Sequence, residues 1–282
     1  MPSLLTTSHT PAHGGVFLLN TETAETRKIL DVPCRGITRG PDGYYTVENF
    51  GVVHYLDPKT WQPVRRAETG YAWCHDLKWF GGYFYLVASK GNWVVRLDSD
   101  FRELDRMQIV ESDDDVCHAN CIEEMDGELI LSIFTLVPGK REEKNGSHPW
   151  RHDGKVLRLD WQRRGYEVLH EPLSQPHSLN WRDGQIYCCE SYTSKLSVIP
   201  GGGQRHRTLR KLNGFVRGLT FDGDRAFVGV TRRRLEHYHP MVRWWARLTR
   251  WCGVLEMDAN TWKPLRRYPL PSRQVYDLTV VR

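Results

Sequence analysis

Three histidines stand in short phrases of similar form. His75 lies in CHDL, His118 in CHAN and His177 in PHSL. Neutral imidazoles from separate rigid strands suit Zn²⁺, and they also bind Fe²⁺, Mn²⁺ or Cu²⁺. If the fold brings these side chains together, we expect a divalent transition-metal site, best suited to zinc, with an open position for water or substrate. The alternative is that each histidine only hydrogen-bonds the end of a strand.

Polar residues in matching phrases could bind and transform a substrate. Arg35 and Arg217 can hold a carboxylate or phosphate through paired N–H donors, and Asn120 adds an amide. Tyr276 and Asp277 could move a proton, the phenol if a metal or an arginine lowers its pKa. These residue types predict a site for a small polar or anionic substrate. Two further loop residues predicted to contact that substrate are Glu48 and Glu190.

A repeated phrase must position these residues. Each copy has a short apolar strand, a turn with Asp-Gly, Gly-Gly or Gly-Asp, and a second alternating strand, which is a hairpin signal. A third strand and a more polar fourth strand follow. Four strands in about 40 residues are typical of a β-propeller blade. The copies lie at 34–49, 74–89, 119–134, 176–191 and 216–231, with a truncated copy at 276–281.

The count of copies predicts an all-β, six-bladed β-propeller. The sixth copy lacks three strands, and three candidate strands stand at 3–9, 15–23 and 25–32. We therefore expect one domain over 1–282, whose last blade is closed by N-terminal and C-terminal strands. Since the innermost strands line the axis of a propeller, the polar residues that precede them should converge at one mouth of the ring. Two insertions interrupt the repeat, at about 135–154 and 231–252.

Composition excludes several classes of protein. The 282 residues include 40% hydrophobic and 26% charged residues, which is ordinary for a globular chain. The net charge of +5 is too small to indicate a nucleic-acid binder. No apolar stretch is long enough to form a transmembrane segment, and the N-terminus lacks the features of a secretory signal. The seven cysteines include no CxxC pair, so we expect a reducing, cytoplasmic location.

The basic excess is concentrated in one insertion. Residues 231–250 contain six arginines and one glutamate, so this segment accounts for the whole net charge. Within it, 240–251 has Trp, Met and Leu at helical spacing. A basic amphipathic helix could make a weak contact with a membrane surface or an acidic partner. It could equally pack on the propeller with its arginines in solvent. The other insertion, 135–154, could be a lid over the mouth or a surface loop.

The order of several phrases resembles a bacterial family of uncharacterised six-bladed β-propeller proteins. The matching phrases are HDL (75–77), CHAN (117–120), PHSLNW (176–181), GFVRGLTFDGDRAFVGV (214–230), WCGVLEMDANTW (251–262) and VYDLTVV (275–281). The resemblance implies no reaction, but it implies that certain residues belong to a shared pattern. These are His75, Asp76, His118, Asn120, His177, Arg217, Tyr276 and Asp277. The regucalcin/gluconolactonase group and peptide amidating lyase are similar in architecture only.

Two functions from different classes follow. The first is a metal-dependent enzyme of lyase or hydrolase type, in which His75, His118 and His177 hold the metal. Arg217 would then bind the substrate and act in catalysis beside Tyr276 and Asp277. The second is a non-catalytic propeller that binds a ligand, or docks on a partner through 231–252. A weaker third possibility is redox chemistry at a histidine-ligated iron or copper.

Overall fold

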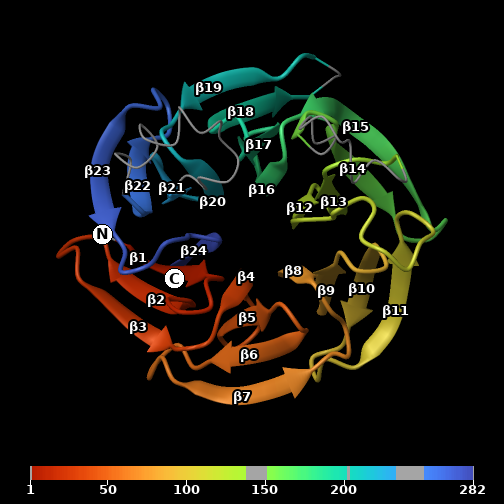
Figure 1. The fold of residues 1–282 in the computed structure, drawn as a ribbon, viewed down its shortest axis with the longest axis horizontal. Helices are drawn as coiled ribbons and strands as arrows, with labels where there is room; N and C mark the ends of the chain where they lie inside the picture. The colour runs from red at the N-terminus through yellow and green to blue at the C-terminus, as the bar shows by residue number, and fades with distance from the viewer. Residues whose placement is uncertain (1, 138–150, 202–203, 233–250, 282) are drawn as a thin grey trace.

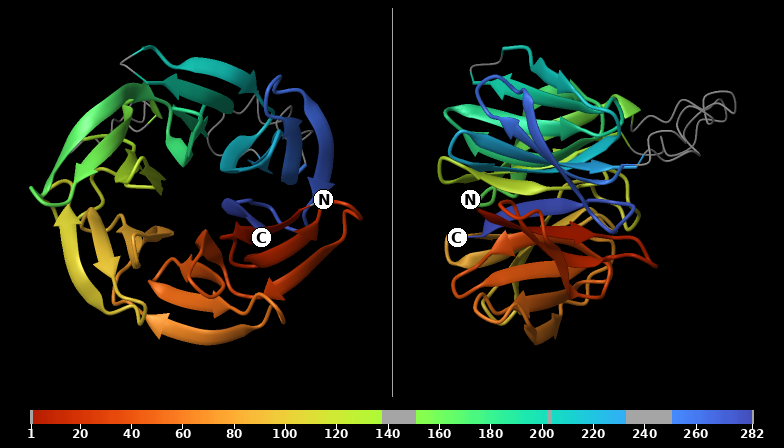
Figure 2. Two further views of the ribbon diagram at one scale, coloured as in Figure 1. Left: turned by 180° about the vertical axis from the view of Figure 1, so that it is seen from behind. Right: turned by 90° about the vertical axis from the view of Figure 1, so that its left-hand side faces the viewer.

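The computed structural model describes residues 2–137, 151–201, 204–232 and 251–281. The regular elements bounded within these residues are β-strands, and they form six four-stranded antiparallel sheets around one axis (Figures 1 and 2). The prediction of an all-β, six-bladed propeller is therefore confirmed. Most of the two predicted insertions, including the helical pattern at 240–251, lies outside the described residues. No helix among the described residues is long and apolar enough to cross a membrane.

The blades are numbered here along the chain. Blade 1 contains β4 (Cys34–Arg39), β5 (Tyr44–Glu48), β6 (Val52–Leu56) and β7 (Pro63–Glu68). Blade 2 contains β8 (Cys74–Phe80), β9 (Tyr83–Ala88), β10 (Trp93–Leu97) and β11 (Glu103–Gln108). Blade 3 contains β12 (Ile122–Met125), β13 (Glu128–Ile133), β14 (Gly154–Asp160) and β15 (Gly165–Leu173).

The second half of the ring follows the same order. Blade 4 contains β16 (Pro176–Arg182), β17 (Gln185–Glu190), β18 (Lys195–Pro200) and β19 (Arg207–Lys211). Blade 5 contains β20 (Phe215–Asp222), β21 (Arg225–Thr231), β22 (Gly253–Asp258) and β23 (Pro264–Pro269). Blade 6 contains β24 (Asp277–Val281) and the three N-terminal strands β1 (Ser3–Ser8), β2 (Gly15–Asn20) and β3 (Thr26–Leu30).

The apolar core lies between the faces of neighbouring blades. Middle strands such as β9 are buried along almost their whole length, so they consist of continuous apolar runs. One cluster joins Tyr45 and Val47 of blade 1 to Leu77, Phe84 and Leu86 of blade 2. Separate clusters join the other neighbouring blades in the same way, and this packing makes the inner strands a rigid frame for side chains at the axis.

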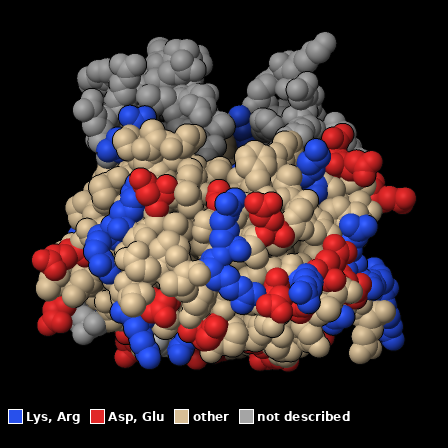
Figure 3. Space-filling view, turned by 90° about the horizontal axis from the view of Figure 1, so that it is seen from below, with Lys and Arg blue, Asp and Glu red and all other residues tan. Residues whose placement is uncertain are grey.

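The outermost strands are polar and exposed. In β7 and β19 nearly every residue is exposed or partly exposed. Both β7 and β23 begin with Pro followed by an aliphatic residue and two arginines. Charged side chains and proline discourage pairing of an open sheet edge with another chain. Lys, Arg, Asp and Glu are interspersed on the side of the ring that Figure 3 shows.

Antiparallel pairing of β24 with β1 closes the ring. Residues Ser3 to Thr7 pair with Val281 to Asp277. The Tyr276 N–H donates to the Thr7 carbonyl at 2.8 Å, and the Asp277 N–H donates to Thr7 Oγ1 at 3.1 Å. The prediction that both ends of the sequence contribute to the last blade is therefore confirmed. This closure carries Tyr276 and Asp277 to the axis.

One extra residue interrupts the pairing of several inner strands. In β8, Cys74 and Asp76 lie opposite Ala88 and Val87, which are adjacent residues of β9. Similar register shifts occur in β4, β16 and β20. A bulge of this kind re-aims the side chains around it. As a result, the side chains of two consecutive residues both lie at the axis, one at the mouth of the ring and one inside the channel.

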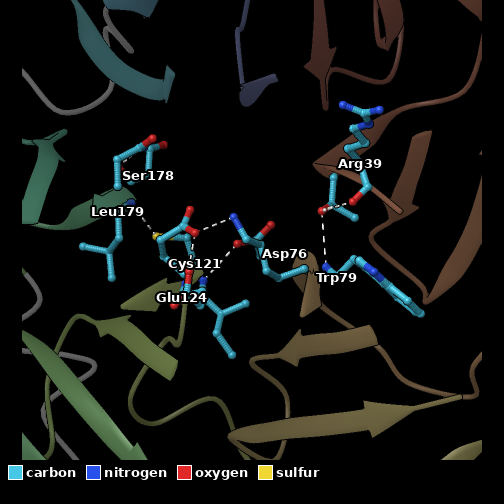
Figure 4. A network of polar contacts seen from close by, with 12 residues as sticks. Arg39, Asp76, Trp79, Cys121, Glu124, Ser178 and Leu179 are labelled. Atoms are coloured by element: carbon cyan, nitrogen blue, oxygen red, sulfur yellow. Dashed lines mark hydrogen bonds and ion pairs between the residues drawn. The ribbon is translucent and has the colours of Figure 1, made fainter. Parts of the chain in front are cut away.

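In four blades, the side chain that follows the residue at the mouth joins neighbouring blades. Figure 4 shows Asp76 and Cys121 in this network, accepting N–H groups from the next blade. Four such bonds are Ile122 N–H to Asp76 Oδ2 at 2.9 Å, Leu179 N–H to Cys121 Sγ at 3.1 Å, Gly218 N–H to Ser178 Oγ at 2.6 Å and Ile37 N–H to Asp277 Oδ2 at 3.1 Å. Buried backbone N–H groups need hydrogen-bond acceptors, so these side chains connect each blade to its neighbour.

Gly218 offers a test of the seam between blades 5 and 6. It has φ +69°, and a Cβ there would lie 2.8 Å from the Leu278 side chain and 3.1 Å from the Asp277 backbone. Gly127 also has a positive φ, +86°, but a Cβ there would meet nothing within 4 Å. We expect Gly127→Ala to cost about 1 kcal/mol of unfolding free energy from backbone strain alone. Gly218→Ala should cost about 2–4 kcal/mol, because overpacking is added.

Urea unfolding of both variants measures this difference. Equal destabilisation by the two substitutions would contradict the close approach of β20 and β24.

Candidate functional site

A pocket of about 290 Å³ opens where the inner strands begin. Five of the six blades, or the segments that lead into them, contribute to its lining. The residues are His9, Arg35, Asn49, Trp73, His75, Ser89, Asp115, His118, Arg217, Gln274 and Tyr276. The axial pocket, as we call it, contains five of the predicted site residues: Arg35, His75, His118, Arg217 and Tyr276.

Tyr276 lies at the centre of the polar contacts. Its hydroxyl is 2.6 Å from His75 Nδ1, and the guanidinium groups of Arg35 and Arg217 lie over its ring at 5.6 and 5.1 Å from the centroid. Burial raises the pKa of Tyr276 above its usual value, and the two arginines only partly oppose this. The side chain therefore stays a phenol at neutral pH, able to donate a proton but not to act as a phenolate base.

His75 is a buried, neutral imidazole. Burial, followed by the positive charge of Arg35, holds the pKa of His75 well below its usual value. Its Nδ1 is also 3.3 Å from Asn120 Nδ2. The Tyr276 hydroxyl and the Asn120 amide can both donate to Nδ1, an arrangement that favours the tautomer with its hydrogen on Nε2. Asn120 thus reaches the pocket through His75, without being part of its lining.

Arg35 brings a positive charge to the pocket without an acidic partner of its own. Its Nη1 donates to the Cys74 carbonyl at 3.1 Å, and its Nη2 is 3.2 Å from His9 Nε2. In the described parts of the chain, no carboxylate lies within ion-pair distance of this guanidinium. A half-buried arginine without a carboxylate partner favours an anion as that partner.

His118 is held by a carboxylate. Asp115 is almost fully buried, and its Oδ2 lies 2.6 Å from His118 Nδ1 while its Oδ1 accepts the His118 backbone N–H at 3.0 Å. The Nδ1–H bond to a carboxylate fixes the tautomer whose lone pair is on Nε2, the form that accepts a proton or binds a metal. Asp115 did not enter the sequence prediction, although a carboxylate three residues before a candidate histidine is a usable signal.

His177 lies beyond an aromatic ring. Phe134 contacts His118, with ring centroids 4.6 Å apart, and also contacts His177 at 5.3 Å. The Nδ1 of His177 lies 2.8 Å from both the Gln175 carbonyl and Ser191 Oγ. The His75 and His118 rings, by contrast, are 4.6 Å apart. The three histidines therefore gather at one end of the ring, but only His75 and His118 line the axial pocket.

Three predicted acidic residues lie away from the axial pocket. Glu48 pairs with His54 Nε2 at 2.7 Å, and Glu190 accepts the Ser174 N–H at 3.0 Å between blades 3 and 4. Asp277 lies inside the channel, where it lines a second cavity of about 260 Å³ together with Asp76. Burial, and then the charge of Asp76, raises the pKa of Asp277 well above its usual value. Burial likewise raises the pKa of Asp76 to about 6.

The cysteines that directly precede Arg35, His75 and His118 are buried thiols. All seven cysteines are free and buried. Burial raises the pKa of Cys34, Cys74 and Cys117 to about 12. Neutral thiols at these positions pack between blades and do not supply thiolate ligands.

The arrangement of the possible metal ligands does not form a metal site among the described residues. Across the described segments, no group of three or more His, Cys, Asp or Glu side chains is placed to hold a metal ion. The contacts of Phe134 with both His118 and His177, and the hydrogen carried by His75 Nε2, are consistent with this. The predicted metal therefore stays a prediction.

A family comparison covers most of the chain. Residues 56–282 match a family described as a domain of unknown function (DUF4915). No curated protein matches the sequence.

Solved structures with a similar fold share little sequence. A structure of a nidogen/laminin complex has a TM-score of 0.71 at 13% identity, covering 100% of this chain and 99% of that one. A protein of unknown function from Bacteroides caccae has a TM-score of 0.66 at 9% identity, with 100% of both chains covered. A luciferin-regenerating enzyme has a TM-score of 0.63 at 12% identity, covering 86% and 78%. Such low identities show a shared propeller fold and nothing about chemistry.

The low pKa of His75 predicts an acid-sensitive contribution to stability. Below pH about 6.5 the unfolded chain binds a proton that the folded His75 does not bind, so unfolding becomes easier as the pH falls. We expect this group alone to add a slope of up to about 1.4 kcal/mol per pH unit between pH about 6.5 and 5.

Urea unfolding at several pH values should show a shallower slope for His75→Asn than for the wild type. His13→Asn, at an exposed turn, is the matched control and should keep the wild-type slope. The same slope in His75→Asn and the wild type would mean that His75 is not held neutral by burial.

Proposed function

Because the matched region spans most of the sequence, the chain belongs to the DUF4915 family of unknown function, and we propose that its axial pocket is an enzyme active site for a small anionic substrate. The observation that carries the proposal is the pairing of Arg35, a cation without an acidic partner in the described residues, with a carboxylate-held imidazole in the same pocket. The lyase or hydrolase class predicted from the sequence is part of this proposal.

The positive charges favour an anionic group. Arg35 and Arg217 both approach the Tyr276 ring, and their charges add to the effect of burial in lowering the pKa of His75. In a pocket partly removed from water such charges act over longer distances than they do in solution. Guanidinium groups match the geometry of carboxylates and phosphates. A volume of about 290 Å³ suits a small metabolite better than a polymer segment.

Two groups could move a proton on the bound substrate. His118, with Asp115 on its Nδ1, has the arrangement of an oriented general base. Tyr276 remains protonated and is bound to His75, so it could return a proton to an oxygen of the substrate. Proton removal by one group and donation by the other is the step that lyases and hydrolases share. Asp277, inside the channel, has no part in this step.

A second candidate keeps the predicted metal. The proximity of the His75 and His118 rings favours it, since their centroids are 4.6 Å apart. Together with His177 they would hold a divalent ion, best suited to zinc, with iron, manganese or copper as other fits. Such an ion would polarise a carbonyl group or activate water. This candidate requires Phe134 to move, because its ring contacts both His118 and His177.

A non-catalytic role through 231–252 also stays a prediction, because 233–250 lies outside the described residues. Structures with this fold include an enzyme and a component of a protein complex, so the fold favours neither class. Deleting 233–250 and measuring binding to anionic vesicles would separate docking from events in the axial pocket.

Anion binding gives the direct test of the proposed function. We expect inorganic phosphate or citrate to bind the wild-type protein and to raise its melting temperature, since ligands that bind only the folded state stabilise it. Arg35→Met and Arg217→Met should each weaken binding at least about tenfold. Arg39→Met is the matched control, because Arg39 is in the same strand as Arg35 but lines the channel cavity instead.

Isothermal titration calorimetry measures the affinities of the wild type and the three variants. Wild-type affinity in both Arg35→Met and Arg217→Met, or equal loss in Arg39→Met, would contradict an anion site at the axial pocket.

Elemental analysis tests the metal-dependent candidate. Protein purified without a histidine tag should carry close to one equivalent of a transition metal if His75, His118 and His177 are ligands. His75→Ala together with His177→Ala should abolish that content. Less than about a tenth of an equivalent in the wild type, unchanged in the double variant, would contradict the metal site.

A further inference from the structure

Asn92 makes an unusual set of contacts next to the axial pocket. Its side chain is fully buried in the turn between β9 and β10 of blade 2. Its Nδ2 donates to three carbonyls of the segment that crosses to blade 3, and its Oδ1 accepts two N–H groups from the same segment. The carbonyls belong to Val110, Ser112 and Asp114 at 3.2, 3.3 and 2.8 Å, and the N–H groups belong to Val116 and Cys117 at 2.9 and 3.0 Å.

The crossing segment, 110–118, carries the carboxylate–imidazole pair of the proposed site. Asp115 lies between residues whose backbone groups bind Asn92, and His118 follows directly after Cys117. His118 itself has a left-handed backbone, with φ +46°. A segment with no regular secondary structure and a residue in this conformation needs external hydrogen bonds to keep one shape. A single amide supplies five of them.

The repeat shows that the turn itself does not need this side chain. Asn92 occupies the turn with φ +58°, accepting the Ile109 N–H and donating to the Ser89 carbonyl. Gly51 in blade 1, with φ +74°, makes the same two backbone contacts, donating to Glu48 and accepting from Thr69. Ser194 in blade 4 does so as well, with φ +59°. The turn therefore forms with glycine or serine as well. The Asn92 amide is needed to bind the crossing segment, not to form the turn.

We propose that Asn92 is a positioning residue that holds Asp115 and His118 in the orientation required at the axial pocket. This inference rests on the proposed function, since the pair has a catalytic use only if the pocket is an active site. Asn92 acts through the backbone of 110–117 and does not line the pocket itself. Its removal should free the imidazole of His118 from the single tautomer that Asp115 imposes.

The substitution Asn92→Gly tests this directly. Glycine keeps the left-handed turn, as Gly51 does, but removes all five side-chain hydrogen bonds. The readout is the tautomer of the His118 ring, measured by ¹⁵N NMR in metal-free protein at pH about 8, where an unperturbed imidazole is neutral. The signal is assigned by its loss in His118→Gln. In the wild type we expect the Nδ1–H form to exceed the Nε2–H form by more than about tenfold.

In Asn92→Gly this ratio should fall at least about threefold, towards the value in Asp115→Asn, which removes the carboxylate itself. Ser194→Gly is the matched control, because it makes the same change in the equivalent turn of blade 4 and should keep the wild-type ratio. If Asn92→Gly fails to fold, Asn92→Asp replaces it. A carboxylate still accepts the two backbone N–H groups but cannot donate to the three carbonyls, so its ratio should lie between those of the wild type and Asp115→Asn.

Phosphate titration of the same variants separates positioning from general damage. Arg35 and Arg217 make no contact with Asn92, so Asn92→Gly should bind phosphate within about threefold of the wild type. A wild-type tautomer ratio in Asn92→Gly, or loss of phosphate binding together with the tautomer, would overturn the inference. Absence of phosphate binding in the wild type would instead contradict the proposed function, while the tautomer ratio would still decide the role of Asn92.

Discussion

The hydrogen bonds between β24 and β1 join the first and last strands into one blade, and the axial pocket exists only in the ring that they close. Tyr276 enters the site directly from this seam, because its N–H is bound to Thr7 of β1. It then contacts His75 of blade 2 and the arginines of blades 1 and 5. Residues far apart in sequence thus depend on one pairing of strands for their mutual distances.

The axis separates two electrostatic environments. At the mouth, burial and then the charge of Arg35 keep His75 neutral, and both Arg35 and Arg217 lie over a protonated Tyr276. Inside the channel, burial raises the pKa of both Asp76 and Asp277, and the charge of Asp76 raises the pKa of Asp277 further. Both carboxyl groups accept N–H groups from neighbouring blades. The bulged inner strands explain why consecutive residues such as His75 and Asp76 differ so sharply in role. One of them lines the axial pocket, and the other joins neighbouring blades.

The sequence alone predicted the six blades, the closure of the ring and the residues that precede the inner strands, because each follows from a repeat that recurs in phase. It could not predict the contacts that depend on side-chain packing. Phe134 contacts two of the three candidate histidines, and Glu48 pairs with His54. Asp115 belongs to a crossing segment that no repeat describes. Such contacts are set by neighbouring blades and leave no periodic signal.

Crystals grown in selenate offer the most direct test of the central claim, that the axial pocket binds an anion. Selenium scatters anomalously, so the position of the ion is observed without assumptions about chemistry. The account predicts the strongest anomalous peak within hydrogen-bond distance of Arg35 and Arg217, beside the Tyr276 ring. Peaks confined to exposed arginines such as Arg66, with none at the axis, would contradict it.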